Sequence, residues 1–203
     1  METLDFILNK YKIDKSAKSP VKLNCTRWGT LPRLFRQLGF KVGAEIGVAG
    51  GRFSKFLCQY GGQKVYAVDA WKIYKGYKDE ESQEKMENLY KEAKNRLSTY
   101  NCQIIRDWSA KAVRRFANNS LDFVYLDANH SYGHTRADVK RWAKKVRTGG
   151  IVAGHDYVNG HHGLNYGVKR AVNEWVEENK IRYLFLLTKR ANVDNMPSWF
   201  YVK

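Results

Sequence analysis

The sequence predicts an α/β fold with a central, mostly parallel, seven-stranded sheet, helices on both faces and an antiparallel β-hairpin at the C-terminal end. Short apolar runs rich in Val, Ile, Tyr and Phe alternate with longer stretches whose apolar positions lie three or four residues apart. This alternation is typical of repeated βα units around a parallel sheet. A polar loop instead of a helix separates the last two β-rich runs, which favours a hairpin there.

The segment 1–41 is expected to be a helical lead-in, with a break between helical pieces at the step from Leu31 to Pro32. The chain's 203 residues fit a single domain, in which 42–203 are expected to form the α/β unit with the alternating strands and helices and the final hairpin. The expected parallel strands are Val42–Gly47, Lys64–Asp69, Cys102–Arg106, Leu121–Asp127 and Gly150–Asp156. The expected helices are Gly50–Tyr60, Glu80–Tyr100, Ala110–Asn118, Tyr132–Val146 and Gly167–Asn179. The expected hairpin strands are Ile181–Thr188 and Ser198–Lys203, around a loop with Asn192, Asp194, Asn195 and Pro197.

The charge is unusual, since 36 Lys and Arg against 20 Asp and Glu give a formal net charge of +16. Such a field attracts anionic small molecules or nucleic acid. The lysines are spread over 10–22, 72–94 and 140–145, which favours a solvated surface over a dedicated nucleic-acid groove. The acidic N-terminal residues and the absence of a long apolar run lead us to expect a cytoplasmic protein without a membrane segment, as a monomer or a homodimer.

The first predicted strand runs into a glycine-rich turn and then into a helix. Glycines at Gly47, Gly50 and Gly51 let the backbone approach a ligand closely, and amides at the start of a helix favour a carboxylate or phosphate. Glu45, at the end of the strand, would repel a pyrophosphate but suits the ammonium group of a methionine moiety. Together with Val48, these residues predict a site for S-adenosylmethionine instead of a dinucleotide.

The second and third strands end in residues that can complete this site. Asp69 can accept hydrogen bonds from both hydroxyls of a ribose, and Ala70 and Trp71 follow it. The third strand is followed by Asp107, Trp108 and Ser109, where a polar side chain can meet an adenine edge and a tryptophan can cover its face. Alternatively, the acids cap turns or helices and the tryptophans belong to the core.

The fourth and fifth strands end in acids and histidines that adjacent strands would bring together. Asp127 and His130 follow the fourth strand, and His155 and Asp156 follow the fifth. Asp127, His155 and Asp156 are oxygen and nitrogen ligands that can hold a divalent cation such as Mg²⁺, and the alternative is a hydrogen-bonded polar cluster. We take Asp127, His130 and Asp156 as candidate catalytic residues, and Asp127 also as a wall of the cofactor site. A solvated turn is expected at His161 and His162.

The stretch from Gly43 to Glu177 resembles class I S-adenosylmethionine-dependent methyltransferases, and in particular a small branch similar to methyltransferase family 24. The matching motifs are Glu45-Gly47-Gly51, Val68-Asp69-Trp71, Asp127-His130-Tyr132, Gly154-His155-Asp156-Tyr157 and Gly167-Val168-Ala171-Val172. The resemblance implies a Rossmann-like fold and methyl transfer from S-adenosylmethionine.

A more distant resemblance to catechol-type O-methyltransferases implies a magnesium site, with Asp127 in the place of the first ligand. The acidic-amide pair of that group is His155-Asp156 here, and its catalytic lysine is His130. We therefore expect O-methylation of a small-molecule or sugar hydroxyl, with His130 as the base and a metal as a possible aid. A nucleic-acid methyltransferase that uses the basic surface is the main alternative. A binding module without acceptor chemistry and a Rossmann oxidoreductase are weaker ones.

Overall fold

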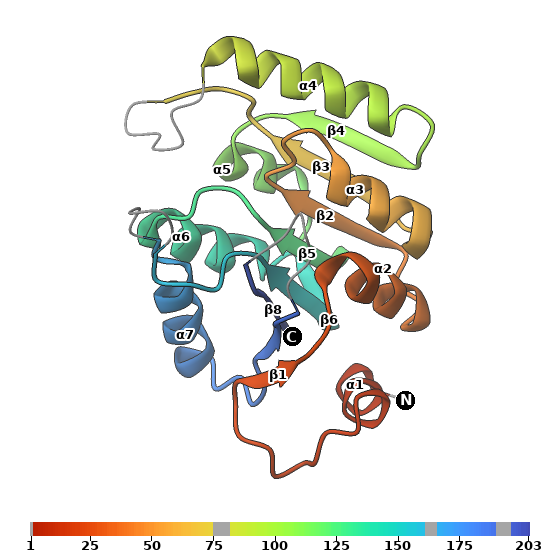
Figure 1. The fold of residues 1–203 in the computed structure, drawn as a ribbon, viewed down its shortest axis with the longest axis vertical. Helices are drawn as coiled ribbons and strands as arrows, with labels where there is room; N and C mark the ends of the chain where they lie inside the picture. The colour runs from red at the N-terminus through yellow and green to blue at the C-terminus, as the bar shows by residue number, and fades with distance from the viewer. Residues whose placement is uncertain (1, 75–81, 161–165, 190–195) are drawn as a thin grey trace.

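The computed structural model describes residues 2–74, 82–160, 166–189 and 196–203, and it contains an α/β sandwich around one sheet of eight strands (Figure 1). The strand order is β1-β7-β8-β6-β5-β2-β3-β4. The strands are β1 Val21–Leu23, β2 Val42–Ile46, β3 Lys64–Asp69, β4 Cys102–Arg106, β5 Leu121–Leu126, β6 Val146–Gly154, β7 Phe185–Leu187 and β8 Ser198–Val202. Only β8 runs against its neighbours β6 and β7, and all other described pairs are parallel.

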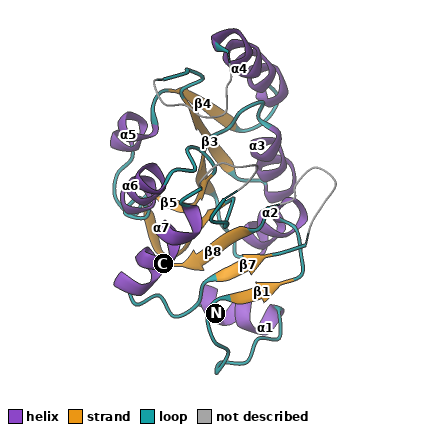
Figure 2. Ribbon diagram, turned by 60° about the vertical axis from the view of Figure 1, so that its left-hand side comes forward, coloured by secondary structure: helices purple, strands orange, loops and turns teal. Residues whose placement is uncertain are grey.

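Helices cover both faces of the sheet, as Figures 1 and 2 show. On one face lie α1 Thr3–Lys10, α2 Arg27–Gln37, α3 Arg52–Phe56 with the π-helical turn Leu57–Gly61, and α4 Gln83–Leu97. On the other face lie α5 Ser109–Ala112 with the 3₁₀ turn Val113–Arg115, α6 Tyr132–Trp142 and α7 Val168–Glu178. Among the described helices, none combines the length and apolar character that crossing a bilayer needs.

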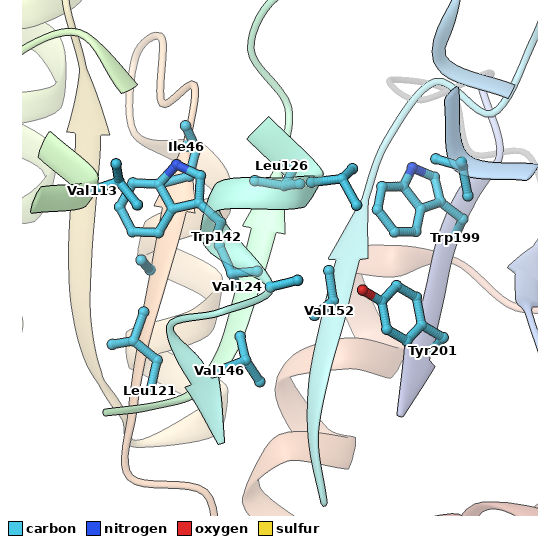
Figure 3. Close-up of a cluster of buried hydrophobic side chains, with 14 of the residues drawn as sticks. Ile46, Val113, Leu121, Val124, Leu126, Trp142, Val146, Val152, Trp199 and Tyr201 are labelled. Carbon is cyan, nitrogen blue, oxygen red and sulfur yellow. The ribbon is translucent and has the colours of Figure 1, made fainter. Parts of the chain in front are cut away.

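Strand alternation sends neighbouring side chains to opposite layers. Along β5, Val124 and Leu126 join the cluster under α5–α7, where Trp142 of α6 is fully buried (Figure 3). Phe123 and Tyr125 point the other way, into the cluster beneath α1–α3. Phe123 stacks on Phe35 of α2 with ring centroids 4.2 Å apart, so the N-terminal segment is part of the core.

The predicted order of elements is confirmed, with one more strand than expected. Residues 21–23 form β1, which pairs in parallel with β7, so segment 1–41 contains an edge strand as well as helices. The predicted break at Leu31-Pro32 is wrong, because α2 continues through Pro32. A proline removes one helical hydrogen bond, and α2 buries Leu31, Leu34 and Phe35 in compensation. The start of the predicted helix at Glu80, the turn at His161 and His162, and the loop residues Asn192, Asp194 and Asn195 lie outside the described residues.

The topology creates one switch point, between β2 and β5. From β2 the chain moves outward to β3 and β4, and then returns to the other side of β2 to form β5 and β6. The carboxyl ends of β2, β3 and β5 are aligned there. The Gly47 amide after β2 donates to Val68 O of β3, and the Asp127 amide after β5 donates to Ile46 O of β2. Open α/β sheets bind ligands in the crevice outside such a point.

Candidate active site

A cavity of about 1210 Å³ opens at this switch point. It is lined by the ends of β2, β3 and β5, the starts of α3 and α5, and parts of α2, α4 and α6. Ten of the residues predicted from the sequence lie in its wall: Glu45, Gly47, Val48, Gly50, Asp69, Ala70, Trp71, Trp108, Ser109 and Asp127. His130 lines the same cavity.

The glycine-rich turn after β2 passes close to other backbone. Gly47 has φ +88°, and a Cβ there would overlap the carbonyl of Asp127. Gly51 has φ +78° and faces Ala93 and Leu97 of α4, so it belongs to the packing of the turn instead of the cavity wall. The turn therefore needs glycine at both positions, one for the meeting of β2 and β5 and one for the contact with α4.

Asp69 at the end of β3 fixes the shape of this turn. Its Oδ2 accepts hydrogen bonds from the Val48 amide at 2.8 Å and the Ala49 amide at 3.1 Å, and its Oδ1 accepts one from the Trp71 amide at 2.9 Å. The carboxylate thus ties the glycine-rich turn to β3, and Asp69 also lines the cavity. These contacts organise the turn, and contact with a ribose would come in addition.

Two further predicted cofactor residues, Trp71 and Glu45, are buried beside the glycine-rich turn. Trp71 is 1% exposed, and its indole N–H donates to the carbonyl of Ala49 at 2.9 Å. Glu45 is 2% exposed, and its carboxyl accepts a hydrogen bond from the hydroxyl of Ser54 in α3. Burial, with a smaller contribution from the charge of Asp127, raises the pKa of Glu45 to about 8. This carboxyl is therefore largely protonated at neutral pH, which the sequence expectation of a carboxylate did not include.

The residues after β4 divide into two groups. Trp108 lines the cavity, and its ring meets Tyr74 edge to face with centroids 5.6 Å apart. Ser109 also lies in the wall, where its hydroxyl donates to Asp138 at 2.6 Å. Asp107, in contrast, is not among the lining residues, because its carboxylate accepts hydrogen bonds from the Trp108 amide and from Arg115.

The acids and histidines of the fourth and fifth strands do come together. His130 Nε2 lies 2.8 Å from Asp156 Oδ2 and 3.7 Å from Asp127 Oδ1. Asp127, His130 and Asp156 offer ligand atoms that lie within 4.8 Å of one another. His155, a predicted ligand, is outside this group of three, although its Nδ1 lies 3.1 Å from Asp156 Oδ2 and 3.8 Å from Asp127 Oδ1. We refer to Asp127, His130 and Asp156 as the reaction cluster.

The geometry of the reaction cluster fits a cation. His130 Nε2 is buried, and the short approach to Asp156 is not aligned as a hydrogen bond, so this nitrogen has no hydrogen-bond partner in the described part of the chain. Asp156 is held with φ +53°, a conformation that is strained for a residue with a side chain. Two carboxylates and an imidazole whose ligand atoms lie within 4.8 Å of one another are a donor set that divalent metals accept once the imidazole has lost its proton.

The charged groups of the cluster shift the pKa values of one another. Burial alone would lower the pKa of His130, but Asp127 and Asp156 outweigh it and raise the pKa to about 10. Burial would raise the pKa of Asp127, yet His155, Arg27 and His130 hold it well below its usual value. Without a metal, the cluster therefore consists of an imidazolium between two carboxylates at neutral pH.

Arg27 of α2 is a site residue that the sequence reasoning missed. It lines the cavity, and its Nη1 donates to Asp127 Oδ2 at 2.7 Å and to the Tyr125 hydroxyl at 2.9 Å. Its side chain is 11% exposed. Nothing in the local sequence separates Arg27 from the many other basic residues of segment 1–41, because the contact arises only when α2 packs against β5.

Comparison with known proteins agrees with this geometry. A family model described as a methyltransferase domain (Methyltransf_24) matches residues 44–157, which is more than half of the chain. A search of curated proteins finds no match. An O-methyltransferase from Bacillus cereus, solved in complex with SAH, superposes with a TM-score of 0.63 at 17% identity, over 99% of this chain and 90% of that one.

Two other solved structures show how far the fold is shared. A SAM-dependent O-methyltransferase from Thermotoga maritima has a TM-score of 0.60 at 13% identity, over 100% of this chain and 71% of that one. A precorrin 8W decarboxylase from Methanobacterium thermoautotrophicum has a TM-score of 0.52 at 13% identity, over 81% and 82% of the two chains. Structural likeness at this identity shows the fold alone. The family match, which covers both the glycine turn and the reaction cluster, shows that the chain belongs to the class I S-adenosylmethionine-dependent methyltransferases.

Proposed function

We propose that this methyltransferase transfers the methyl group to a hydroxyl oxygen of a small molecule, and that the reaction cluster forms the acceptor end of the cavity. One observation carries the proposal: Asp127 and His130 line the same cavity as the glycine turn and Asp69. A donor seated on the turn and an acceptor at the cluster would share one cavity. The B. cereus and T. maritima structures, both O-methyltransferases, support oxygen as the acceptor atom.

Positioning supplies most of the catalysis in this proposal. The acceptor oxygen forms a bond to the methyl carbon, the bond from that carbon to sulfur breaks with its electrons passing to sulfur, and the hydroxyl proton has to leave. Because the sulfonium is already a good leaving group, the residues of the cluster have only to orient the hydroxyl and manage one proton.

The charges of the cluster favour other roles for His130 and Asp127 than the predicted ones, in which His130 is the base. His130 as the base requires a neutral imidazole, whereas its pKa is raised to about 10 by the neighbouring carboxylates. We propose that the His130 imidazolium holds the Asp127 carboxylate toward the acceptor hydroxyl, and that Asp127 Oδ1 receives the hydroxyl proton as the new bond to the methyl carbon makes that proton strongly acidic. Asp127, His130 and Asp156 would hold a divalent cation, and the chemistry that it would supply is a lower pKa of the acceptor hydroxyl.

The experiment uses S-adenosylmethionine with a trideuterated methyl group and a metabolite extract, separated after reaction into small molecules and polymers. We expect mass spectrometry to find the label on an oxygen of a small molecule. Asp127→Asn and His130→Gln should each lower this labelling by about 100-fold or more, because one removes the group that receives the proton and the other removes the group that holds it in place. Binding of S-adenosylmethionine, measured by calorimetry, should stay within about twofold.

Asp5→Asn is the matched control, since this acid lies on the surface in an ion pair with Lys15 at 3.7 Å. It should label like the wild type. Normal labelling by both cluster variants would refute the acceptor site. Label in the RNA or DNA fraction would instead favour the nucleic-acid alternative that the +16 charge suggests. A parallel reaction with a chelator reports whether turnover depends on a metal.

A further inference from the structure

Arg27 brings a permanent positive charge to the reaction cluster from outside residues 44–157, the part of the chain that the family model matches. Its guanidinium lies over the rings of Trp28, Phe53 and Tyr125, at 4.7, 5.2 and 5.6 Å from the ring centroids. An aromatic enclosure of this kind holds a guanidinium in place and excludes water. Because arginine stays protonated in proteins, the charge cannot be removed by a change of pH.

The contact with Arg27 divides the two oxygens of Asp127 between two partners. Oδ2 accepts the 2.7 Å hydrogen bond from Arg27 Nη1, and Oδ1 lies 3.7 Å from His130 Nε2. The guanidinium thus turns the carboxylate so that one oxygen faces the cluster. Asp127 can then offer a metal ion a single oxygen, whereas a free carboxylate can offer both.

The same contact sets the electrostatics of the cluster. The acidic charges of Asp127 and Asp156 are what would attract a cation. A buried guanidinium bound directly to one of them cancels part of that attraction, and it repels a dication held on the other oxygen of the same carboxylate. With the side chains of Arg27 and Asp127 only 11% and 19% exposed, this repulsion is screened less than between surface charges.

We propose that Arg27 is a positioning residue that keeps the affinity of the reaction cluster for divalent cations low, by occupying one oxygen of Asp127 and by its fixed charge. The inference rests on the proposed function in treating the cluster as the acceptor site, but it concerns the binding of a cation and not turnover. It implies that any metal at this site binds weakly and exchanges with the medium.

The test is Mn²⁺ binding to the full chain, followed by electron paramagnetic resonance and calorimetry without S-adenosylmethionine or acceptor. Arg27→Gln removes the charge and the contact with Asp127 but keeps a polar side chain. We expect it to bind Mn²⁺ at least about 10-fold more tightly than the wild type, because the repulsion is lost. Arg27→Lys keeps the charge and should bind Mn²⁺ within about threefold of the wild type.

Arg36→Gln is the matched control, since Arg36 lies exposed in the last turn of the same helix. It should leave Mn²⁺ binding unchanged. Asp156→Asn in the Arg27→Gln background should remove the gain, which would locate the ion at the cluster. Equal or weaker Mn²⁺ binding by Arg27→Gln would overturn the inference, as would a gain in Arg27→Lys. The second variant decides the matter if the first does not fold.

The outcome is separable from that of the proposed function. If Arg27→Gln gains Mn²⁺ affinity while Asp127→Asn and His130→Gln still transfer the methyl group normally, the inference about Arg27 stands and the acceptor site is wrong. If those two variants lose turnover and Arg27→Gln gains no Mn²⁺ affinity, the acceptor site stands and the role of Arg27 is wrong.

Discussion

The two ends of the cavity are built in different ways. The donor end is held mainly by backbone: the turn after β2 is shaped by Gly47 and by the amides of Val48 and Ala49, which donate to Asp69. The reaction end is held by charged side chains, with His130 and Asp127 from the loop after β5, Asp156 after β6 and Arg27 from α2.

This difference corresponds to two tasks, the binding of a methyl donor and the binding of one particular acceptor. The donor is the same molecule throughout the family, so a rigid backbone cradle suffices for it. An acceptor site has to suit one acceptor, and side chains from several elements can be exchanged without rebuilding the fold. Substitutions at the donor end should therefore act on folding and donor binding, and those at the reaction end on turnover.

The largest effect is expected from Gly47→Ala, which would break the junction of the two ends. Its φ is +88°, and a Cβ would meet the backbone of Asp127 and Ala128, which cannot give way as a flexible side chain can. We expect a loss of more than about 3 kcal/mol in the free energy of unfolding, or no folded protein. Urea denaturation followed by circular dichroism measures it.

Gly133→Ala is the control for that change, because a Cβ at this position in α6 would have no heavy atom within 4 Å. It should be neutral or should stabilise the protein by up to about 1 kcal/mol, since alanine favours a helix over glycine. Equal destabilisation by both variants would argue against close contact at Gly47 as the cause.

A smaller effect, confined to the donor end, is expected from Asp69→Asn. The amide can no longer accept from both sides, so either the Trp71 amide or the pair at Val48 and Ala49 loses its partner. We expect the affinity for S-adenosylmethionine to fall about 10-fold to 100-fold by calorimetry. Asp107→Asn should lower it less, because Asp107 is bound to Arg115 outside the cavity wall. An equal loss would support the predicted cofactor role of Asp107.

The smallest effect is a pH dependence of stability that comes from Glu45. Its pKa in the folded protein is raised from 4.5 to about 8, so the folded state holds a proton that the unfolded state releases between these values. The contribution of Glu45 to stability therefore falls as the pH rises through this window. The difference in urea midpoint, wild type minus Glu45→Gln, should decrease from pH 5 to pH 8. A difference that increases would mean that Glu45 is ionised in the folded state.

The sequence was informative where function depends on neighbours along the chain. The strands β3 and β4 have the predicted bounds, because their apolar runs are sharply bordered. The meeting of Glu45, Gly47 and Asp69 in one cavity was also expected, since each lies at or next to the end of a strand, and their binding of the donor stays a prediction. The additional strand, β1, was not predicted, because its three residues, Val21–Leu23, are too few to show a periodicity and their pairing depends on β7.

The reaction end was predicted only in part. Adjacent strands did bring Asp127, His130 and Asp156 together, but the sequence reasoning named His155 as the metal ligand, whereas His130 completes the group of three in the structure. The ranking depends on loop geometry, including the positive φ of Asp156. Arg27 and the raised pKa of His130 follow from tertiary packing and burial, which no local pattern records.

The account depends most on the independence of donor binding from the reaction cluster. The direct measurement is calorimetric titration of S-adenosylmethionine into His130→Gln and Asp69→Asn, with trideuteromethyl transfer assayed on the same preparations. We predict that His130→Gln binds the donor like the wild type and transfers the methyl group about 100-fold more slowly or worse, while Asp69→Asn binds the donor at least about 10-fold more weakly. Weakened donor binding in His130→Gln together with unaltered binding in Asp69→Asn would contradict the assignment of the two ends.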